Sequence, residues 1–276
     1  MAEQTVAEAI REAAARLAET SDTARLDAEL LMAEALAVSR SDMLLRHAGD
    51  AVPPSFAEFV QRRAAHEPVA YILGHQEFFG RSFIVTPDVL IPRGDSESVV
   101  DAALEFLADR GRILDCGTGS GALLLTLLAE TPAAEGIGID KSLGAVSVAA
   151  ANAARLGVQE RAHLLRLDWH EADWNEGLGR FGLIIANPPY VETGAALSPS
   201  VRDFEPGSAL FAGADGLDDY RVLVPQFHDL LEQNGTAIVE IGFAQAEPVS
   251  DLARQEGFEV TLRRDLADRP RALVLR

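Results

Sequence analysis

The chain has 276 residues, enough for one large domain or for a large domain and a small one. Hydrophobic residues make up 48% and charged residues 24%, both ordinary values for a globular protein. The formal net charge of −19 argues against a DNA- or RNA-binding protein, because so acidic a surface repels phosphate backbones, although a local basic patch would be compatible with it.

The cysteine content and the hydropathy of the chain exclude further classes of protein. Cys116 is the single cysteine, which excludes an internal disulfide, and no Cys/His spacing typical of a zinc site occurs. The first residues lack the charged and apolar regions of a signal peptide, and no apolar run approaches the ~18 residues of a membrane span. We therefore expect a cytoplasmic protein that binds neither a membrane nor a metal.

Residues 1–70 are expected to form a small, alanine-rich helical domain. Apolar residues recur there at helical spacing, namely Val6, Ile10, Ala13, Ala14, Leu17, Leu26, Leu30, Ala33 and Leu36. Ser41 is expected to cap a short helix over residues 42–46, and Pro53-Pro54-Ser55 to open another. Since no catalytic constellation is present, two interpretations stay open: a stabilising cap, or a docking arm for a large substrate.

The next segment changes in composition. Residues 68–74 and 78–85 are rich in aromatic and β-branched side chains, with glycines between them. This pattern predicts a β-hairpin, which we expect to act as a linker over residues 71–92.

From residue 112 onward, strand-length apolar runs alternate with helical patterns. Strands are expected at residues 112–115, 136–140, 163–169, 181–186, 236–241, 258–262 and 272–275, and helices at 122–130, 145–156, 220–232 and 247–256. Such alternation is typical of a doubly wound, mostly parallel α/β sheet, which we expect to occupy a domain over residues 93–276.

A glycine-rich loop, Cys116-Gly117-Thr118-Gly119-Ser120-Gly121, follows the first of these strands. Its spacing differs from the dinucleotide fingerprint, and it lacks the lysine of a P-loop. Glycines at alternate positions let the backbone turn tightly and approach a ligand closely. The pattern therefore favours a ligand that need not contain a phosphate.

The next two strands are expected to end in polar or aromatic side chains. Asp140 follows the loop by about 20 residues, a spacing that suits an acid on two ribose hydroxyls. Asp168 can accept a hydrogen bond from an adenine amino group, and Trp169 can pack on the adenine ring. Groups at three successive strand ends can thus bind one nucleoside that carries no phosphate, and S-adenosylmethionine is such a ligand.

The fourth strand runs directly into Asn187-Pro188-Pro189-Tyr190. Two prolines cannot donate to a sheet ladder, so the motif is the exit of a buried strand, at the edge where open α/β sheets bind ligands. The Asn187 side-chain oxygen and the Pro188 carbonyl can accept both N–H bonds of a planar NH2 group, while Tyr190 can stack on its face. Together with the nucleoside site, the motif predicts a class I S-adenosylmethionine-dependent methyltransferase.

The chain resembles the release factor glutamine methyltransferases, the PrmC/HemK family. The resemblance extends beyond the methyltransferase core to the blocks 68–74, 86–93, 201–206, 209–211, 213–220 and 240–243. Adenine-amino DNA methyltransferases share Asn-Pro-Pro-Tyr, so this motif does not separate the two families, whereas the blocks at 68–74 and 201–220 do.

The resemblance implies methylation of the side-chain amide nitrogen of the glutamine in the Gly-Gly-Gln motif of class I peptide chain release factors, by direct in-line transfer. It implies a cofactor site formed by Gly117, Thr118, Gly119, Ser120, Gly121, Asp140, Trp169 and Asn187, and a glutamine site formed by Asn187, Pro188, Pro189 and Tyr190. The partner would be the release factor, without direct contact to nucleic acid, and a monomer is expected.

Two residues depart from the family pattern. Gly94 stands where the family has proline, and Cys116 stands where it has an aliphatic residue. Arg93, Asp95 and Glu97 are equally compatible with a capping cluster and with the mouth of a cofactor site. Gly94 loosens the start of the following helix, which leaves the role of Arg93 and Asp95 open.

Two alternatives remain at this stage. One is an adenine-amino DNA or RNA methyltransferase, against which the acidic composition and the lack of a segment rich in Arg and Lys argue. The other is a catalytically silent S-adenosylmethionine-binding module, against which the intact Asn-Pro-Pro-Tyr motif argues.

Overall fold

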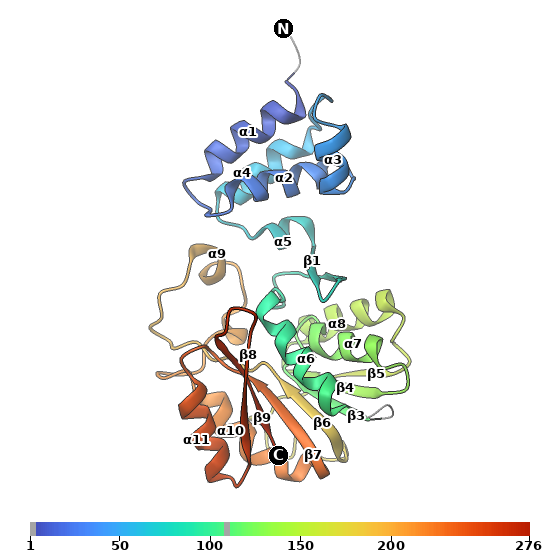
Figure 1. Ribbon diagram of the computed structural model, residues 1–276, viewed down its shortest axis with the longest axis vertical. Helices are drawn as coiled ribbons and strands as arrows, with labels where there is room; N and C mark the ends of the chain where they lie inside the picture. Colours follow the sequence, from blue (N-terminus) through green and yellow to red (C-terminus); the bar gives the residue numbers. More distant parts are fainter. Residues whose placement is uncertain (1–3, 108–110) are drawn as a thin grey trace. The chain divides into compact units, whose positions relative to one another are not determined.

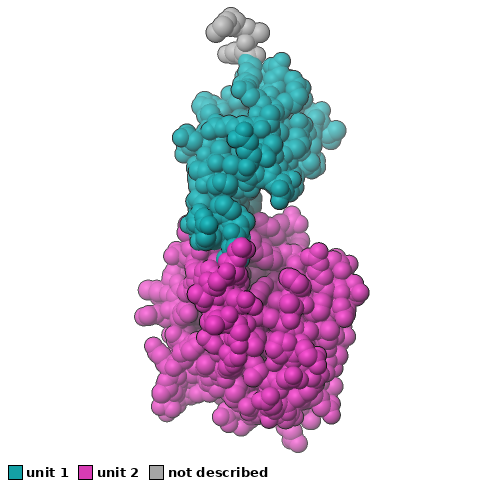
Figure 2. Space-filling model, turned by 90° about the vertical axis from the view of Figure 1, so that its left-hand side faces the viewer, with its two compact units in different colours: residues 1–75, 197–204 teal, residues 76–196, 205–276 magenta. Residues whose placement is uncertain are grey.

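The computed structural model describes residues 4–107 and 111–276 (Figure 1). The first three residues, part of the N-terminal stretch that was not expected to be a signal peptide, lie outside the described residues. The chain divides into two compact units, coloured separately in Figure 2. One contains residues up to 75 together with 197–204, and the other contains residues 76–196 and 205–276.

The first unit is helical, as expected. Its helices are α1 (Val6–Leu17), α2 (Ala24–Ala35), α3 (Arg40–Arg46), α4 (Ser55–Ala64), α5 (Val69–Leu73) and the short α9 (Pro199–Arg202). Apolar side chains from α1 to α5 form a single buried cluster that includes Ile10, Leu31, Met43, Phe56 and Ile72. Segment 197–204 joins this unit although it is distant in sequence.

Two predictions for the first unit and the linker were wrong. Ser39, not Ser41, caps α3: its extended backbone directs the hydroxyl toward the Asp42 N–H at 3.0 Å, whereas Ser41 is already helical. Residues 69–73 form helix α5 rather than a strand, because Pro68 fixes a helix-compatible φ and Gly74 ends the turn at φ +76°. The hairpin consists of β1 (His75–Phe78) and β2 (Arg81–Ile84).

The second unit contains a seven-stranded sheet in the order β5-β4-β3-β6-β7-β9-β8. Its strands are β3 (Arg112–Cys116), β4 (Glu135–Asp140), β5 (Ala162–Arg166), β6 (Phe181–Ala186), β7 (Leu231–Glu240), β8 (Val260–Arg264) and β9 (Pro270–Leu275). The first five strands pair in parallel, and β9 runs antiparallel to both of its neighbours. This confirms the expected doubly wound, mostly parallel sheet.

Helices cover both faces of this sheet (Figure 1). Side chains of α6 (Glu97–Phe106), α7 (Ala122–Glu130) and α8 (Leu143–Leu156) share one buried cluster, and those of α10 (Asp218–Leu230) and α11 (Ala246–Gln255) share the other. The 3-10 turn η1 (Gly94–Ser96) leads directly into α6, and the 3-10 turn η2 (Gly207–Ala209) lies between α9 and α10. Within the described ranges, no helix has both the length and the apolar character needed to cross a bilayer.

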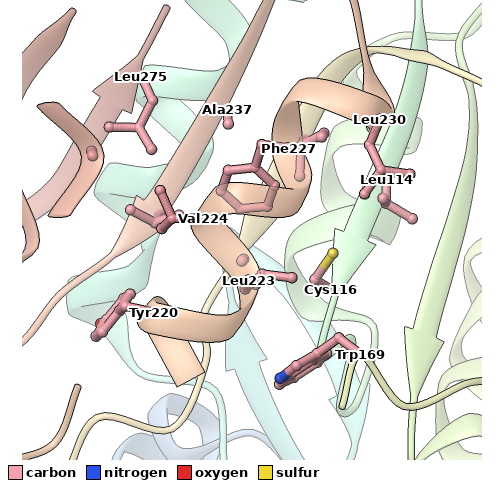
Figure 3. Packing of buried hydrophobic residues seen from close by; sticks show 14 of the residues in the cluster. Leu114, Cys116, Trp169, Tyr220, Leu223, Val224, Phe227, Leu230, Ala237 and Leu275 are labelled. Carbon is pink, nitrogen blue, oxygen red and sulfur yellow. The ribbon is translucent and has the colours of Figure 1, made fainter. Parts of the chain in front are cut away.

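The strand residues alternate between the two clusters, as the pleat of a doubly covered sheet requires. On β3, Ile113 joins the α6–α8 cluster, whereas Leu114 and Cys116 join the other. Figure 3 shows part of the second cluster, with Cys116 and Trp169 among the labelled side chains. Cys116 is fully buried, and burial raises the pKa of its thiol well above the usual value, so it acts as a small apolar residue.

Candidate active site

The carboxyl ends of β3, β4 and β6 meet at the point where the strand order reverses, which is where such sheets bind ligands. A pocket lies there. Eight of the residues proposed from the sequence line it: Gly117, Thr118, Gly119, Ser120, Asp140, Trp169, Asn187 and Pro189. Gly121 instead precedes helix α7 as its N-cap at φ +82°, and Pro188 is buried and does not line the pocket.

The glycine-rich loop is held by backbone and carboxylate groups of the sheet edge. The N–H groups of Gly117 and Thr118 donate to the Ile139 carbonyl at 2.9 and 2.8 Å. The Gly119 N–H donates to Asp140 Oδ2 at 3.0 Å, and the other Asp140 oxygen accepts from the Ser142 N–H at 2.9 Å. Each carboxylate oxygen keeps a second lone pair, so Asp140 can still accept hydrogen bonds from the hydroxyl groups of a ligand.

Gly117 is needed for the close packing of this loop. Its φ is +80°, a left-handed conformation that other residues adopt only under strain. A Cβ atom there would lie 3.2 Å from the Trp169 ring. The loop and the tryptophan therefore form one continuous wall of the pocket.

Trp169 is fixed by a partner that the sequence did not suggest. Its indole N–H donates to Asp219 Oδ1 at 2.9 Å, and the ring is 6% exposed. Asp219 lies in the first turn of α10, where an acid is ordinarily interpreted as complementing the helix dipole. This long-range bond leaves the indole ring free to contact a ligand while its polar edge is satisfied.

Asp168 occupies a different position from the expected one. Strand β5 ends at Arg166, so Asp168 and Trp169 lie in the loop beyond it. The Asp168 carboxylate accepts from the N–H of His170 at 3.0 Å and pairs with its ring, and it does not line the pocket. The Asp168 carboxylate is therefore not placed to accept from an adenine amino group in this pocket.

Asp115, near the end of β3, is a buried acid directly before the glycine-rich loop. Burial raises the pKa of its carboxyl to about 7, with Asp140 adding to the rise, although the Thr118 hydroxyl donates to it at 2.7 Å and opposes the shift. Its Oδ1 has no hydrogen-bond partner among the described residues. The loop is thus built over a carboxyl group that titrates near neutral pH.

The pocket residues fit S-adenosylmethionine better than a phosphate-bearing cofactor. The charged lining residues are Asp88, Arg93, Asp140 and Lys141, and Arg93 is already paired with Glu205. Carboxylates suit the ribose hydroxyls and the positive charges of this cofactor, and the Trp169 ring suits its adenine. Only Lys141 is left to attract a phosphate, so a dinucleotide is disfavoured.

Two oxygens of the Asn-Pro-Pro-Tyr corner, residues 187–190, accept no hydrogen bond from a described protein group. Neither the Asn187 side chain nor the Pro188 carbonyl hydrogen-bonds to another described protein group, although Pro188 and Pro189 are buried and Asn187 is half-buried. The Tyr190 carbonyl accepts from Gln245 Nε2 at 3.0 Å, and its hydroxyl faces Glu240 Oε1 at 3.5 Å. Gln245 and Glu240 are further residues that sequence reasoning missed, because both act across long sequence separations.

Arg93, Asp95 and Glu97 do not form a cluster. Arg93 pairs with the buried Glu205, Asp95 accepts from Arg271 at 2.8 Å, and Glu97 accepts from the Phe79 N–H at 2.8 Å. None of the three gives the helix a side-chain cap. Arg93 lines the cofactor pocket, which agrees with the second interpretation for this residue alone.

A doubly wound sheet of this strand order, with a glycine-rich loop, an acid after the next strand and Asn-Pro-Pro-Tyr at its switch point, is typical of a class I S-adenosylmethionine-dependent methyltransferase. A solved methyltransferase from Pyrococcus furiosus has the same fold: it aligns with a TM-score of 0.52 over 71% of this chain and 89% of its own, at 16% identity.

The sequence comparisons identify the family. The PrmC N-terminal domain matches residues 8–74, and the methyltransferase small domain matches residues 96–204. A release factor glutamine methyltransferase of Cereibacter sphaeroides is 41% identical over 98% of both chains. One of Geobacter sulfurreducens is 41% identical over 86% of this chain and 84% of its own. The chain belongs to the release factor glutamine methyltransferase family.

Proposed function

We propose that this protein methylates the side-chain amide nitrogen of the glutamine in the Gly-Gly-Gln motif of class I peptide chain release factors. The observation that carries the proposal is the pair of free oxygens, Asn187 Oδ1 and the Pro188 carbonyl, at the strand exit beside the cofactor pocket. The family membership supplies the substrate class.

S-adenosylmethionine, when bound, supplies an electrophilic methyl group on a sulfonium. The residues that would hold it are those of the pocket wall: Gly117, Thr118, Gly119, Ser120, Gly121, Asp140, Trp169 and Asn187. Asp140 offers acceptors for hydroxyl groups, and Trp169 offers an apolar face of fixed orientation because Asp219 binds its N–H.

The acceptor nitrogen needs orientation more than deprotonation. An amide nitrogen is a poor nucleophile because its lone pair is delocalised. Asn187 Oδ1 and the Pro188 carbonyl can accept its two N–H bonds, directing the lone pair toward the cofactor pocket and favouring pyramidalisation. Holding two reactants in this way can contribute roughly 7–11 kcal/mol to catalysis.

The proton released by the reaction needs no strong base in this mechanism. Asn187 hydrogen-bonds to no acid or base among the described side chains. A methylated amide that still carries both of its original hydrogens is acidic enough to lose one to water. The protein therefore contributes mainly by positioning the two reactants.

We also infer that the helical domain, residues 1–70, is a docking arm for the release factor and that residues 71–92 link it to the methyltransferase domain. A docking arm recognises parts of the partner beyond the glutamine loop. The whole release factor is then expected to have a much lower KM than a short Gly-Gly-Gln peptide, with a similar kcat. Equal kcat/KM for the two substrates would contradict the docking role.

The proposed reaction is tested by methyl transfer from labelled S-adenosylmethionine to a purified class I release factor, with duplex and single-stranded DNA as parallel acceptors. Label in the release factor alone is the expected result. Label in DNA would favour the adenine-amino alternative, and cofactor binding without transfer to any acceptor would favour a silent binding module.

A further inference from the structure

A second, polar pocket shares Pro92 and Arg93 with the cofactor pocket. Its wall includes Asp95, Tyr190, Glu240 and Arg271. Unlike the cofactor pocket, it is built around a buried carboxylate and a buried guanidinium. The proposed mechanism assigns no role to either group.

Glu240 is the last residue of β7 and is 1% exposed. One of its carboxylate oxygens faces the Tyr190 hydroxyl at 3.5 Å, and the other, Oε2, has no hydrogen-bond partner in the described part of the chain. Its backbone carbonyl accepts from the Tyr220 hydroxyl at 2.7 Å, so the strand end itself is firmly held. A carboxyl group kept in this place without full hydrogen bonding is unfavourable for stability.

The surroundings of Glu240 have opposing effects on the pKa of its carboxyl group. Burial raises the pKa of the carboxyl to about 7, and Asp95 adds to the rise, whereas the Ser96 hydroxyl, Arg271 and the Tyr190 hydroxyl lower it. Arg271 is itself shared between Asp95 at 2.8 Å and Asp265 at 3.4 Å. Burial likewise raises the pKa of Tyr190 to about 12, so its hydroxyl stays protonated and can donate.

We propose that Glu240 is a positioning residue for the methyl acceptor: its carboxylate holds the Tyr190 hydroxyl and so fixes the last residue of the Asn-Pro-Pro-Tyr corner. This inference rests on the proposed function. Gln245 holds the same residue from the other side by binding its carbonyl at 3.0 Å. Tyr190 is therefore fixed at the main chain by an amide and at the ring by a carboxylate.

A positioning role accounts for a buried carboxylate that is unfavourable for stability. A purely structural Glu240 would contribute to stability, and a neutral isostere would weaken the fold and the reaction together. For a positioning carboxylate, stability and rate are expected to change in opposite directions. Removing the charge relieves the burial penalty and keeps or raises stability, while the acceptor site becomes less ordered and the reaction slower.

Glu240→Gln tests the proposal, with Glu232→Gln as the matched control. Glu232 lies on the same strand and is exposed. Glu240→Gln is expected to lower kcat on the release factor roughly 10- to 100-fold, a size typical of a misplaced reactant. Its cofactor affinity should stay at the wild-type value, and its resistance to urea at about pH 8 should equal or exceed that of the wild type. The control should match the wild type in all three measurements.

The pH profile and a second variant separate positioning from other roles. At saturating cofactor, wild-type kcat should rise through about pH 7, and Glu240→Gln should lose this rise. Tyr190→Phe should lower kcat, and the double variant should be no slower than the slower single variant, because both changes remove one contact. The proposal would be overturned if the losses of the two single variants added up in the double variant. It would also be overturned if Glu240→Gln kept the rise of kcat through about pH 7, or kept kcat within twofold of the wild type. Lack of methylation by the wild-type protein would instead refute the proposed function.

Discussion

At the scale of single residues, Asn187 has the main role in the proposed mechanism, because its side chain would orient the amide nitrogen that is methylated. Its side chain is left free at the strand exit, where both it and the Pro188 carbonyl can accept from one NH2 group. Asn187→Ala is expected to lower kcat by roughly 100-fold or more, since a misplaced reactant loses about that much, while cofactor affinity falls far less. Single-turnover methylation and calorimetric cofactor titration would measure the two effects, with Asn175→Ala as the control. Near wild-type turnover of Asn187→Ala would refute the lone-pair argument.

Gly117 is the residue whose backbone shapes the cofactor wall. Gly117→Ala is expected to weaken cofactor binding roughly tenfold or more, because the new methyl group meets the Trp169 ring at 3.2 Å and the left-handed backbone is strained. Gly157→Ala is a suitable control: its φ of +70° imposes similar strain, but a Cβ there meets nothing within 4 Å. Calorimetry should show a loss of affinity in the first variant only. Equal affinity for both would mean that the tryptophan contact is unimportant.

At the scale of elements, Asn152 connects the hairpin to the cofactor loop. Its side chain accepts from the Ile84 N–H at 2.7 Å and donates to the carbonyls of Ile84 and Ser120 at 3.0 and 2.9 Å. Asn152 is fully buried in α8, so Asn152→Ala leaves three backbone groups unpaired. We expect the free energy of unfolding to fall by roughly 2–4 kcal/mol in urea titrations. A change within about 0.5 kcal/mol, as expected for Asn175→Ala, would contradict this role.

The elements also show how far the sequence alone reaches. Parallel strands of short apolar runs place their ends at one edge, so Gly117, Asp140 and Asn187 could be assigned to one site from pattern alone. The prediction for helix α5 was wrong because five residues, of which Val69, Tyr71 and Ile72 are β-branched or aromatic, are too few to show a helical period, and the chemistry of Pro68 and Gly74 decides their conformation.

The residues that hold the site in place could not be predicted in the same way. Asp219, Glu240 and Gln245 reach Trp169 or Tyr190 over at least 50 residues of sequence. Their neighbours in the chain resemble ordinary helix starts and strand ends. Only the three-dimensional fold shows which of these carboxylates and amides have a partner at the site.

At the scale of the whole molecule, the buried acids make stability depend on pH. Burial raises the pKa of Asp115 and of Glu240 to about 7. In the unfolded chain these groups ionise near pH 4, so between about pH 4 and about pH 7 the folded state binds more protons and stability falls as pH rises. The lowered pKa of Asp265 acts in the opposite direction, but its contribution to stability is complete above about pH 4.

The cofactor-free protein is therefore expected to be less stable at about pH 8 than at about pH 5.5, by roughly 2 kcal/mol for each of the two buried acids. Asp115→Asn and Glu240→Gln should each flatten this dependence, which urea titrations at the two pH values would reveal. A wild-type stability that rises over this range, or variants with the wild-type slope, would show that the two carboxyl groups are not protonated in the folded protein.

The protein is expected to transfer one methyl group to the side-chain nitrogen of one glutamine. The most direct test of this expectation is tandem mass spectrometry of a class I release factor after incubation with this protein and S-adenosylmethionine. We predict a single added methyl group on the Gly-Gly-Gln glutamine, located on the side-chain amide, and none on a factor with that glutamine changed to alanine. A methyl group on another residue, or on both factors alike, would contradict the account of the acceptor site.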